Sequence, residues 1–292
     1  MTSSLKIIFK LVCTIALIVL IIFWIKWDNV WFSIKQSNAL IIIFPTMVWI
    51  VSLLLGALRW FFLLREKEHP ISYKKIAVLY WQSLFFINYL PAGLGGDVFR
   101  FKKLRDLKLH SKTNINILII DRASGFFGIL LLILLLGFSV KDLIRAHTDL
   151  QAIYLLSAVG MGLMMLACIL KPKFLKHILN FKTEILLKII LISTFFQFLS
   201  SLSLYSIFHF LHIGLPFYQG LWLATSTTLS ELIPITINSI GVKELSGVYL
   251  FDYLNSSKEE IISVFIVARS LQLILSLSGG MLYLFFNFKK AR

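Results

Sequence analysis

Long apolar stretches alternate with short polar ones along the whole chain. The apolar stretches run over residues 7–25, 39–64, 71–90, 113–138, 151–170, 185–211, 217–237 and 260–288. A helix of about 20 apolar residues spans the hydrocarbon core of a bilayer, so most of these stretches are long enough to cross a membrane. The pattern predicts an all-α polytopic integral membrane protein with about eight hydrophobic segments.

The positions of the basic residues indicate how these segments cross the membrane. If all of them crossed fully from a cytoplasmic N-terminus, the Lys- and Arg-rich loops at 100–112 and 171–188 would lie outside, against the positive-inside rule. The conflict disappears if residues 71–97 and 217–241 each enter the membrane and return to the side they came from. We therefore expect six full spans, two re-entrant broken helices and cytoplasmic N- and C-termini.

The two re-entrant segments would enter from opposite faces, so the halves of the chain would form an inverted repeat. Residues 1–140 and 150–292 would each hold two spans, one re-entrant segment and a closing span, a plan common among secondary transporters. In each half a proline of the re-entrant segment precedes an arginine of the closing span at a similar distance. These pairs are Pro91 and Arg122, 31 residues apart, and Pro234 and Arg269, 35 residues apart.

The composition agrees with a membrane protein. The chain is 58% hydrophobic and only 15% charged, so we expect a single transmembrane domain over residues 1–292 with no soluble catalytic domain. The net charge of +15 comes from basic residues in short loops beside the apolar stretches, where they favour cytoplasmic anchoring and attraction to anionic lipid rather than nucleic acid binding. Cys13 and Cys168 lie in apolar stretches and the histidines are scattered, so neither a disulfide, a metal site nor a cofactor is expected.

The first re-entrant segment ends in a glycine-rich motif. It contains Asn88, Pro91, Gly93, Gly95, Gly96, Asp97 and Arg100. Proline ends the preceding helix, and glycine lets the backbone approach a ligand closely. Irregular backbone at membrane depth is tolerated where it lines a cavity. Asp97 stands at the expected N-cap of a short basic helix over residues 98–110 and would either cap that helix or form, with Arg100, an anion-binding pocket.

The short basic helix has apolar residues at three-residue spacing. They are Val98, Phe101, Leu104 and Leu107. The helix would lie at the cytoplasmic interface, either as a solvated loop helix or as a landing site for anionic lipid head groups.

Charged residues also occur inside the spans, where each costs about 2.5 to 3.5 kcal/mol on insertion scales. Asp121 and Arg122 are adjacent on one helix and point in different directions, so we expect them to pair with different partners. They belong either to a structural interhelical salt bridge or to a phosphate site in which the aspartate orients the arginine. Arg269 takes the matching place in the second half, and Arg59, near the end of its span, is expected to snorkel.

The second broken segment carries a comparable set of polar residues. They are Glu231, Pro234, Asn238, Gly241, Lys243 and Glu244. Glu231 lies deep in an apolar run and must be neutral or paired. Lys243 and Glu244 are either an exposed pair near the outer surface or part of the same site.

These motifs, taken in order, resemble the transmembrane flippase domain of lysylphosphatidylglycerol synthases and the stand-alone flippase-like membrane proteins built from that domain. The resemblance covers nearly the whole chain and implies a lipid translocase fold with paired re-entrant helices. The second motif of that family usually has arginine where this chain has Lys243, which keeps the charge but loses a bidentate fork. The cytoplasmic aminoacyltransferase domain of the bifunctional synthases is not expected in this chain, so we expect no enzymatic activity.

We therefore expect a lipid translocase of the inner (plasma) membrane. Its lipid would be an anionic or aminoacylated phospholipid or a polyprenyl-phosphate-linked sugar, bound near the midplane. Arg100, Arg122 and Arg269 would hold the phosphate, and nearby carboxylates would orient them or bind a cationic substituent. The residues assigned to this site are Asn88, Pro91, Gly93, Gly95, Gly96, Asp97, Arg100, Asp121, Arg122, Glu231, Pro234, Asn238, Gly241, Lys243, Glu244 and Arg269.

Two alternatives stay open at this point. An integral-membrane transferase acting on a lipid-linked sugar or a phospholipid would need a carboxylate cluster at one membrane face, and the sequence offers no compact one except Glu259 and Glu260. A helper subunit of a cell-envelope lipid or glycan pathway would co-purify with an enzyme. Membrane lipids are the expected partners, with such an enzyme or a second copy of the chain as further candidates.

Overall fold

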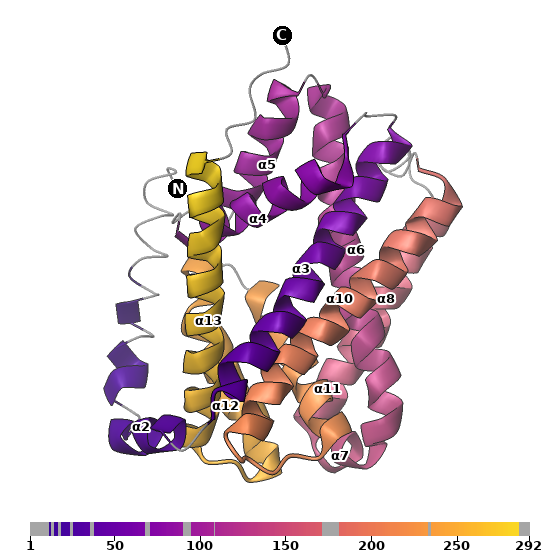
Figure 1. Ribbon diagram of the computed structural model, residues 1–292. Coiled ribbons are helices and arrows are strands. Elements are labelled where there is room, and N and C mark those ends of the chain that lie inside the picture. The colour runs from indigo at the N-terminus through magenta and orange to yellow at the C-terminus, as the bar shows by residue number, and fades with distance from the viewer. Residues whose placement is uncertain are drawn as a thin grey trace.

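A computed structural model of the protein describes residues 12, 15–16, 19–23, 26–35, 38–67, 71–89, 95–107, 109–170, 181–232 and 235–285. This part of the chain is helical and contains no strand (Figure 1). Five of its helical stretches are long and apolar enough to cross a membrane. They are α3 (Leu40–Glu66), the run of α6 (Ser111–Gly137), η1 (Phe138–Val140) and α7 (Lys141–Ala146), then α8 (Thr148–Leu170), α10 (Thr183–Phe210) and α13 (Lys258–Phe285). The predicted all-α polytopic membrane fold is confirmed.

The long helices coincide closely with the apolar stretches of the sequence. The predicted span at 39–64 is α3, and the predicted span at 185–211 is α10. The first predicted span, residues 7–25, lies mostly outside the described residues, so the count of eight segments stays a prediction. The short helix α2 (Trp27–Lys35) precedes α3.

Two helices that the sequence assigns to broken segments are shorter than a typical span: the first has 17 residues, the lower limit for crossing a bilayer, and the second has 11. They are α4 (Tyr73–Tyr89) and α11 (Phe217–Thr227). The first is followed by α5 (Gly95–Asp106), and the second by η2 (Thr228–Leu232), η3 (Ile237–Ser239), α12 (Val242–Phe251) and η4 (Asp252–Leu254). In Figure 1, α4 and α5 lie at one end of the molecule, and α11 and α12 lie towards the other. We call these the α5 end and the α12 end. This opposition is what two re-entrant segments from opposite faces require, and their re-entrant nature stays a prediction.

Each end of the molecule has its own apolar core, and each core packs one broken segment. At the α5 end, Trp60 and Leu63 of α3 pack with residues of α4, α5 and the start of α6. At the α12 end, Phe208, Trp222 and Phe251 belong to a cluster built from α10, α11, α12 and α13. Helices α6 and α10 contribute to both cores and hold the two ends together.

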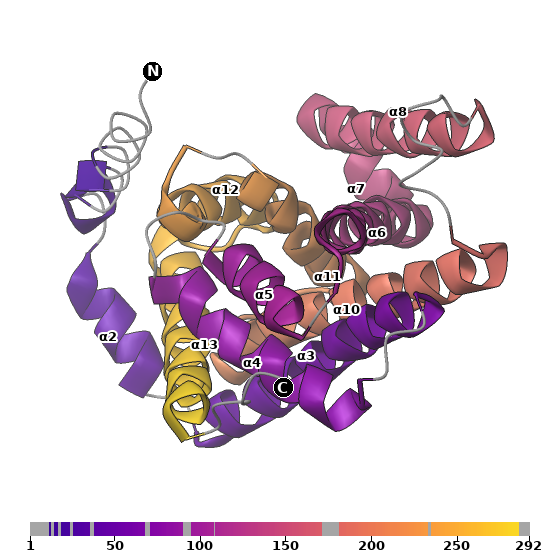
Figure 2. The same ribbon diagram turned by 90° about the horizontal axis from the view of Figure 1, so that it is seen from above.

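Small residues let the helices approach closely, as is typical of membrane proteins, where burial against lipid gives no driving force. A Cβ at Gly128 of α6 would lie 2.9 Å from the backbone of Ser193 on α10. A Cβ at Gly280 of α13 would lie 2.7 Å from the ring of Phe85 on α4. Seen from the α5 end, α5 covers the middle of the assembly, whereas α2 and α8 lie at opposite sides of its periphery (Figure 2). The outer face of α8 is apolar, since Leu156 is 71% and Ile169 is 73% exposed, and lipid would cover it.

Packing relates the elements of the two halves in matching pairs. Helix α3 packs on α4 as α10 packs on α11, and α5 packs on α6 as α12 packs on α13. Helix α4 of the first half also packs on α13 of the second, just as α11 packs on α6. An inverted repeat with boundaries at 1–140 and 150–292 would produce these pairs, and the repeat itself stays a prediction.

Candidate functional site

The two broken segments meet inside the molecule through a pair of asparagines. Asn88 lies near the end of α4, and Asn238 lies in η3. The side-chain amide of Asn238 donates a hydrogen bond of 2.7 Å to the amide oxygen of Asn88. Asn238 has φ 50° and ψ 33°, a left-handed conformation that asparagine tolerates better than most residues. The predicted breaks at Pro91, Gly93 and Pro234 lie outside the described residues.

The glycines of the two motifs serve the backbone around these breaks. A Cβ at Gly96 would lie 2.9 Å from the carbonyl oxygen of Ser83, so glycine lets the start of α5 fold back against α4. Gly95 is the first residue of α5. Gly241 has φ 84°, which favours glycine, and its N–H donates to a carboxylate oxygen of Glu244 at 2.7 Å. These three glycines therefore have packing and capping roles in this structure.

A group of five charged residues joins α3, α5 and α6 at the α5 end; we call it the closed cluster. Asp121 receives hydrogen bonds from Arg59 Nε at 2.7 Å and from Arg100 Nη1 at 3.1 Å. Asp97 is paired with Arg100 and with Arg122. Arg59, Arg100 and Asp121 are 5%, 5% and 2% exposed. Asp121 is shared by the two buried arginines, and Asp97 supplies Arg100 with a second carboxylate.

Three sequence expectations for this cluster have outcomes in the structure. Asp121 and Arg122 have different partners, as predicted. The snorkelling of Arg59 is wrong, because its guanidinium turns inward to Asp121 and also donates to Ser193 Oγ at 3.0 Å. Asp97 as N-cap is also wrong, because α5 begins at Gly95 and places Asp97 inside the first turn.

The face that the basic helix buries coincides only in part with its three-residue apolar spacing. Phe99, Arg100 and Leu104 of α5 are buried, whereas Val98 is 62% exposed. The ion pairs of Arg100 rotate the helix so that this arginine, and not Val98, faces the interior. The three-residue apolar spacing could not reveal this, because it ignores charges that are paired across helices.

A second group of four charged residues lies on η2, α12 and α13; we call it the open cluster. Lys243 is paired with Glu231, and Arg269 Nη2 donates to Glu244 Oε1 at 3.0 Å. The interpretation of Lys243 and Glu244 as an exposed surface pair is wrong, because each pairs with a different element and Glu244 is only 9% exposed. Arg269 also reaches the backbone carbonyl of Asn238 at 3.4 Å, which ties this cluster to the asparagine pair.

The two clusters share one spacing that the sequence analysis missed. Asp97 is the third residue of α5 and pairs with Arg122, 25 residues later. Glu244 is the third residue of α12 and pairs with Arg269, also 25 residues later. An acid followed by an arginine at this interval, once in each half, was a signal in the sequence that could have found both pairs.

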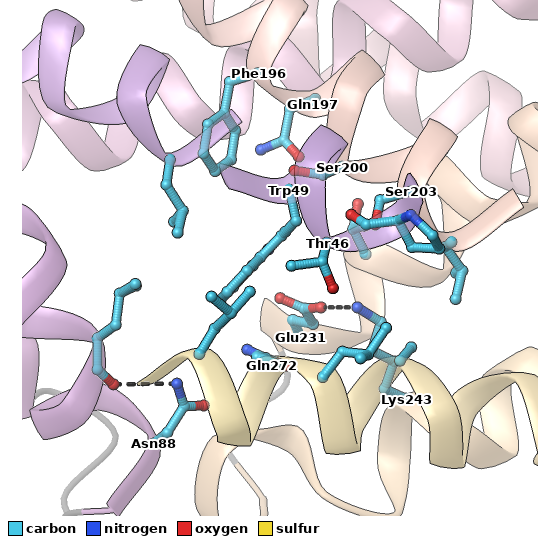
Figure 3. Close-up of a pocket in the computed structure, with 18 of the residues that line it drawn as sticks. Thr46, Trp49, Asn88, Phe196, Gln197, Ser200, Ser203, Glu231, Lys243 and Gln272 are labelled. Atoms are coloured by element: carbon cyan, nitrogen blue, oxygen red, sulfur yellow. Dashed lines mark hydrogen bonds and ion pairs between the residues drawn. The ribbon is translucent and has the colours of Figure 1, made fainter. Parts of the chain in front are cut away.

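A cavity of about 330 Å³ lies between the broken segments. Figure 3 shows its polar lining, with Glu231 and Lys243 joined by their ion pair and Trp49 extending into it from α3. Of the residues predicted for the site, those that line it are Asn88, Glu231, Asn238 and Lys243. The other described candidates lie outside its lining: Gly95, Gly96, Asp97, Arg100, Asp121, Arg122, Gly241, Glu244 and Arg269.

Several lining residues were not predicted from the sequence. Thr46 and Trp49 come from α3, Gln272 from α13, and Gln197 and Ser200 from α10. On α10 the lining residues Gln197, Ser200, Ser203 and Ile207 recur at helical spacing along one face. Polar residues at such spacing inside an apolar span were the available signal.

The candidate residues differ in whether their charged groups are available to a ligand. The guanidinium group of Arg100 is paired with two carboxylates and that of Arg269 with one. Both lie outside the lining of this cavity, so neither is poised to bind a phosphate within it. Arg122 is 58% exposed at its side chain but is paired with Asp97. Glu231 and Lys243 are the charged residues among those described that line the cavity.

Comparison with protein families agrees with this architecture. The family model of the lysylphosphatidylglycerol synthase TM region matches residues 11–280. The chain belongs to this family. No curated protein matches the chain. Membership of the lysylphosphatidylglycerol synthase TM family, together with the apolar helices, identifies a multi-pass membrane protein of lipid metabolism or transport.

Proposed function

We propose that this member of the lysylphosphatidylglycerol synthase TM family moves phospholipids between the two leaflets of the inner (plasma) membrane. The observation that carries the proposal is a cavity with charged and amide groups in its lining, to which both broken segments contribute, one from each end of the molecule. Moving a lipid across a bilayer requires its polar head group to pass the hydrocarbon core, where unpaired polar groups are strongly unfavourable. A cavity with charged and amide groups between membrane-spanning helices lowers that barrier.

The size of the cavity fits a head group and not a whole lipid. Its volume of about 330 Å³ is at the lower end of the range for small-molecule sites. The acyl chains would therefore stay in the bilayer while the head group occupies the cavity. Broken helices that supply the substrate site near the midplane are the general plan of secondary transporters.

In this proposal the three arginines that the sequence analysis assigned to phosphate binding have a structural role instead. Arg100 and Arg122 brace α5 against α6, and Arg269 braces α12 against α13. They hold the two broken segments in place around the cavity, and the phosphate is bound by Lys243 instead. Lipid transport needs no covalent step, so the protein acts as a transporter and not as an enzyme, with lipid as its partner.

The orientation follows from the uneven distribution of basic residues. Helix ends that carry many of them gather at the α5 end: Arg65, Lys74, Lys75, Lys102, Lys103, Arg105, Lys112 and Lys182. By the positive-inside rule the α5 end faces the cytoplasm. Labelling of single cysteines from the outside tests this, with Cys13 and Cys168 replaced first. The exposed position Asp252→Cys should react and the exposed position Lys102→Cys should not; the reverse pattern would overturn the orientation.

Reconstitution tests the transport itself. Purified protein would be placed in liposomes that contain phospholipids labelled with a fluorophore on one acyl chain, and a membrane-impermeant reductant would bleach the outer leaflet. We expect the labelled lipid of the inner leaflet to become accessible faster than in protein-free liposomes and in liposomes with an unrelated polytopic protein. Equal rates for every labelled phospholipid in all three preparations would contradict the proposed function.

A further inference from the structure

The ion pair that faces the cavity differs from the pairs of Asp121 in its access to solvent. The side chain of Glu231 is 45% exposed and that of Lys243 is 22% exposed. In the closed cluster, the side chains of Asp97 and Asp121 are 13% and 3% exposed. The Glu231–Lys243 pair is therefore accessible to a ligand that enters the cavity, whereas Asp121 and its arginines are not.

We propose that Glu231 and Lys243 form a head-group subsite that selects zwitterionic phospholipids with a primary ammonium group, such as phosphatidylethanolamine. This inference rests on the proposed transport function and names the lipid class that the same cavity takes. When the head group enters, its ammonium group becomes the partner of Glu231 and its phosphate becomes the partner of Lys243. Glu231 thus exchanges the ammonium group of Lys243 for that of the lipid, and Lys243 exchanges the carboxylate of Glu231 for the lipid phosphate.

Charge balance favours this class over the others. The cavity wall carries one negative and one positive group, which compensate each other in the empty state. An anionic head group without an ammonium group would bind Lys243 and leave Glu231 beside a phosphate without a counter-ion. A charge left unpaired in a low-dielectric site is costly, whereas an exchange of partners keeps every charge paired. A head group with one phosphate and one ammonium group satisfies both residues at once.

The rest of the lining supports both halves of such a head group. Trp49 extends into the cavity (Figure 3), and an indole ring is a favourable neighbour for an ammonium group. The hydroxyl oxygen of Thr46, which lines the same cavity, is buried and has no hydrogen-bond partner among the described residues. The amides of Asn88 and Asn238 provide further hydrogen-bonding groups near the point where the segments meet. The cavity thus offers more polar contacts than its own ion pair uses.

The test compares two lipids that differ only in the head group. Liposomes with the parent protein would carry acyl-labelled phosphatidylethanolamine or acyl-labelled phosphatidylglycerol, and the bleaching rate would be measured for each. We expect phosphatidylethanolamine to cross about tenfold faster, since one charge-assisted hydrogen bond gained or lost corresponds to about that factor. Equal rates would overturn the inference while leaving the transport function intact, and transport of neither lipid would overturn the transport function.

Variants of Glu231 and Lys243 distinguish the roles of the two residues in head-group binding. Glu231→Gln should lower phosphatidylethanolamine transport about tenfold, because the ammonium group loses its charged partner. It should raise phosphatidylglycerol transport, because the phosphate no longer leaves a carboxylate without a counter-ion. Glu231→Asp should keep the selectivity, and Lys243→Arg should keep both rates. Lys141→Met, at an exposed position on α7, is the control outside the cavity and should match the parent. A Glu231→Gln protein that elutes as a single species and retains the parent ratio of the two rates would overturn the assignment.

A competition arm distinguishes a lipid from a soluble ligand of the same chemistry. Free phosphoethanolamine carries the same charged groups without acyl chains. We expect it at millimolar concentration to leave transport of labelled phosphatidylethanolamine unchanged, because the acyl chains held in the bilayer keep the lipid head group at high local concentration. Strong inhibition by the soluble compound would overturn the lipid as the ligand and assign the cavity to a soluble zwitterion.

Discussion

The closed cluster at the α5 end and the open cluster beside the cavity both pair acidic with basic side chains, but they differ in their access to a ligand. In the closed cluster Asp121 is almost completely buried between Arg59 and Arg100. In the open cluster one pair, Glu231 with Lys243, faces the cavity. A buried ion pair that no ligand can reach stabilises the packing of the helices, whereas an ion pair that lines a cavity can bind a ligand. A charged residue inside a membrane segment is therefore not by itself a sign of a substrate site.

The largest expected effect comes from removing the carboxylate that the closed cluster shares. Asp121→Asn would leave two buried guanidinium groups with one charged partner fewer, and breaking a buried pair typically costs about 3–5 kcal/mol. Steric trapping in bicelles would measure the free energy of unfolding. Asp142→Asn, at an exposed position on α7, is the matched control and should change it little. Similar values for the two variants would show that the closed cluster is not a brace.

The next largest effect on stability is expected at the two arginines that follow an acidic residue by 25 positions. The side chain of Arg269 is 16% exposed and that of Arg122 is 58% exposed. We expect Arg269→Ala to lower the free energy of unfolding by about 1.5–3 kcal/mol, the range for hydrogen bonds to charged groups. Arg122→Ala should cost about 1 kcal/mol or less, because exposed pairs are weak. Steric trapping also ranks these two variants. A larger loss of unfolding free energy for Arg122→Ala than for Arg269→Ala would contradict the expected difference between the two arginines.

The cavity pair should contribute little to stability. Lys243→Met leaves Glu231 without its partner in the lipid-free protein, where its side chain is 45% exposed and open to water. We therefore expect a loss of about 1 kcal/mol or less, in contrast to the lipid-bound state, in which a head group excludes water. Transport should nevertheless fall strongly, because the phosphate loses its partner. Parallel unfolding and transport measurements check this separation. A loss of stability as large as that of Asp121→Asn would show that the Glu231–Lys243 pair has a structural role like that of the closed cluster.

A further comparison concerns the asparagine contact between the broken segments. Asn238→Gly removes the hydrogen bond to Asn88 but permits the left-handed backbone, so it should cost about 1 kcal/mol. Asn238→Ala removes the same bond and adds a backbone penalty of about 1–2 kcal/mol. The order of the two variants in thermal unfolding distinguishes these contributions. Alanine as stable as glycine at this position would show that the backbone is not strained there.

Much of the fold could be predicted from the sequence, because each long helix is a continuous apolar run with polar ends. The start of α10 at Thr183 and the end of α6 at Gly137 lie close to the predicted limits. The shortness of α4 and α11 was expected from the charge distribution, which disfavoured two full crossings. These features are local properties of the chain.

The site could be predicted only in part, because it depends on which helices face one another. Asn88 and Glu231 line the cavity, as their place in the two predicted broken segments indicated. Arg59 looked like a residue that reaches the interface, and only the packing of α3 against α6 brings it to Asp121. Likewise, Asp97 lies only three residues before Arg100, but no local pattern indicates that Asp121 is the second carboxylate partner of this arginine. Pairing between distant helices decides whether a cation is free to bind a phosphate.

A blocked cavity gives the most direct test of the account. Ser200 lines the cavity on α10, and Leu191 lies on the same helix with 68% of its surface exposed. Transport of acyl-labelled phosphatidylethanolamine would be measured in liposomes for Ser200→Trp and Leu191→Trp. We predict that the first variant loses transport and the second keeps the parent rate. A Ser200→Trp protein that is folded and still moves the lipid at the parent rate would contradict a route through the cavity.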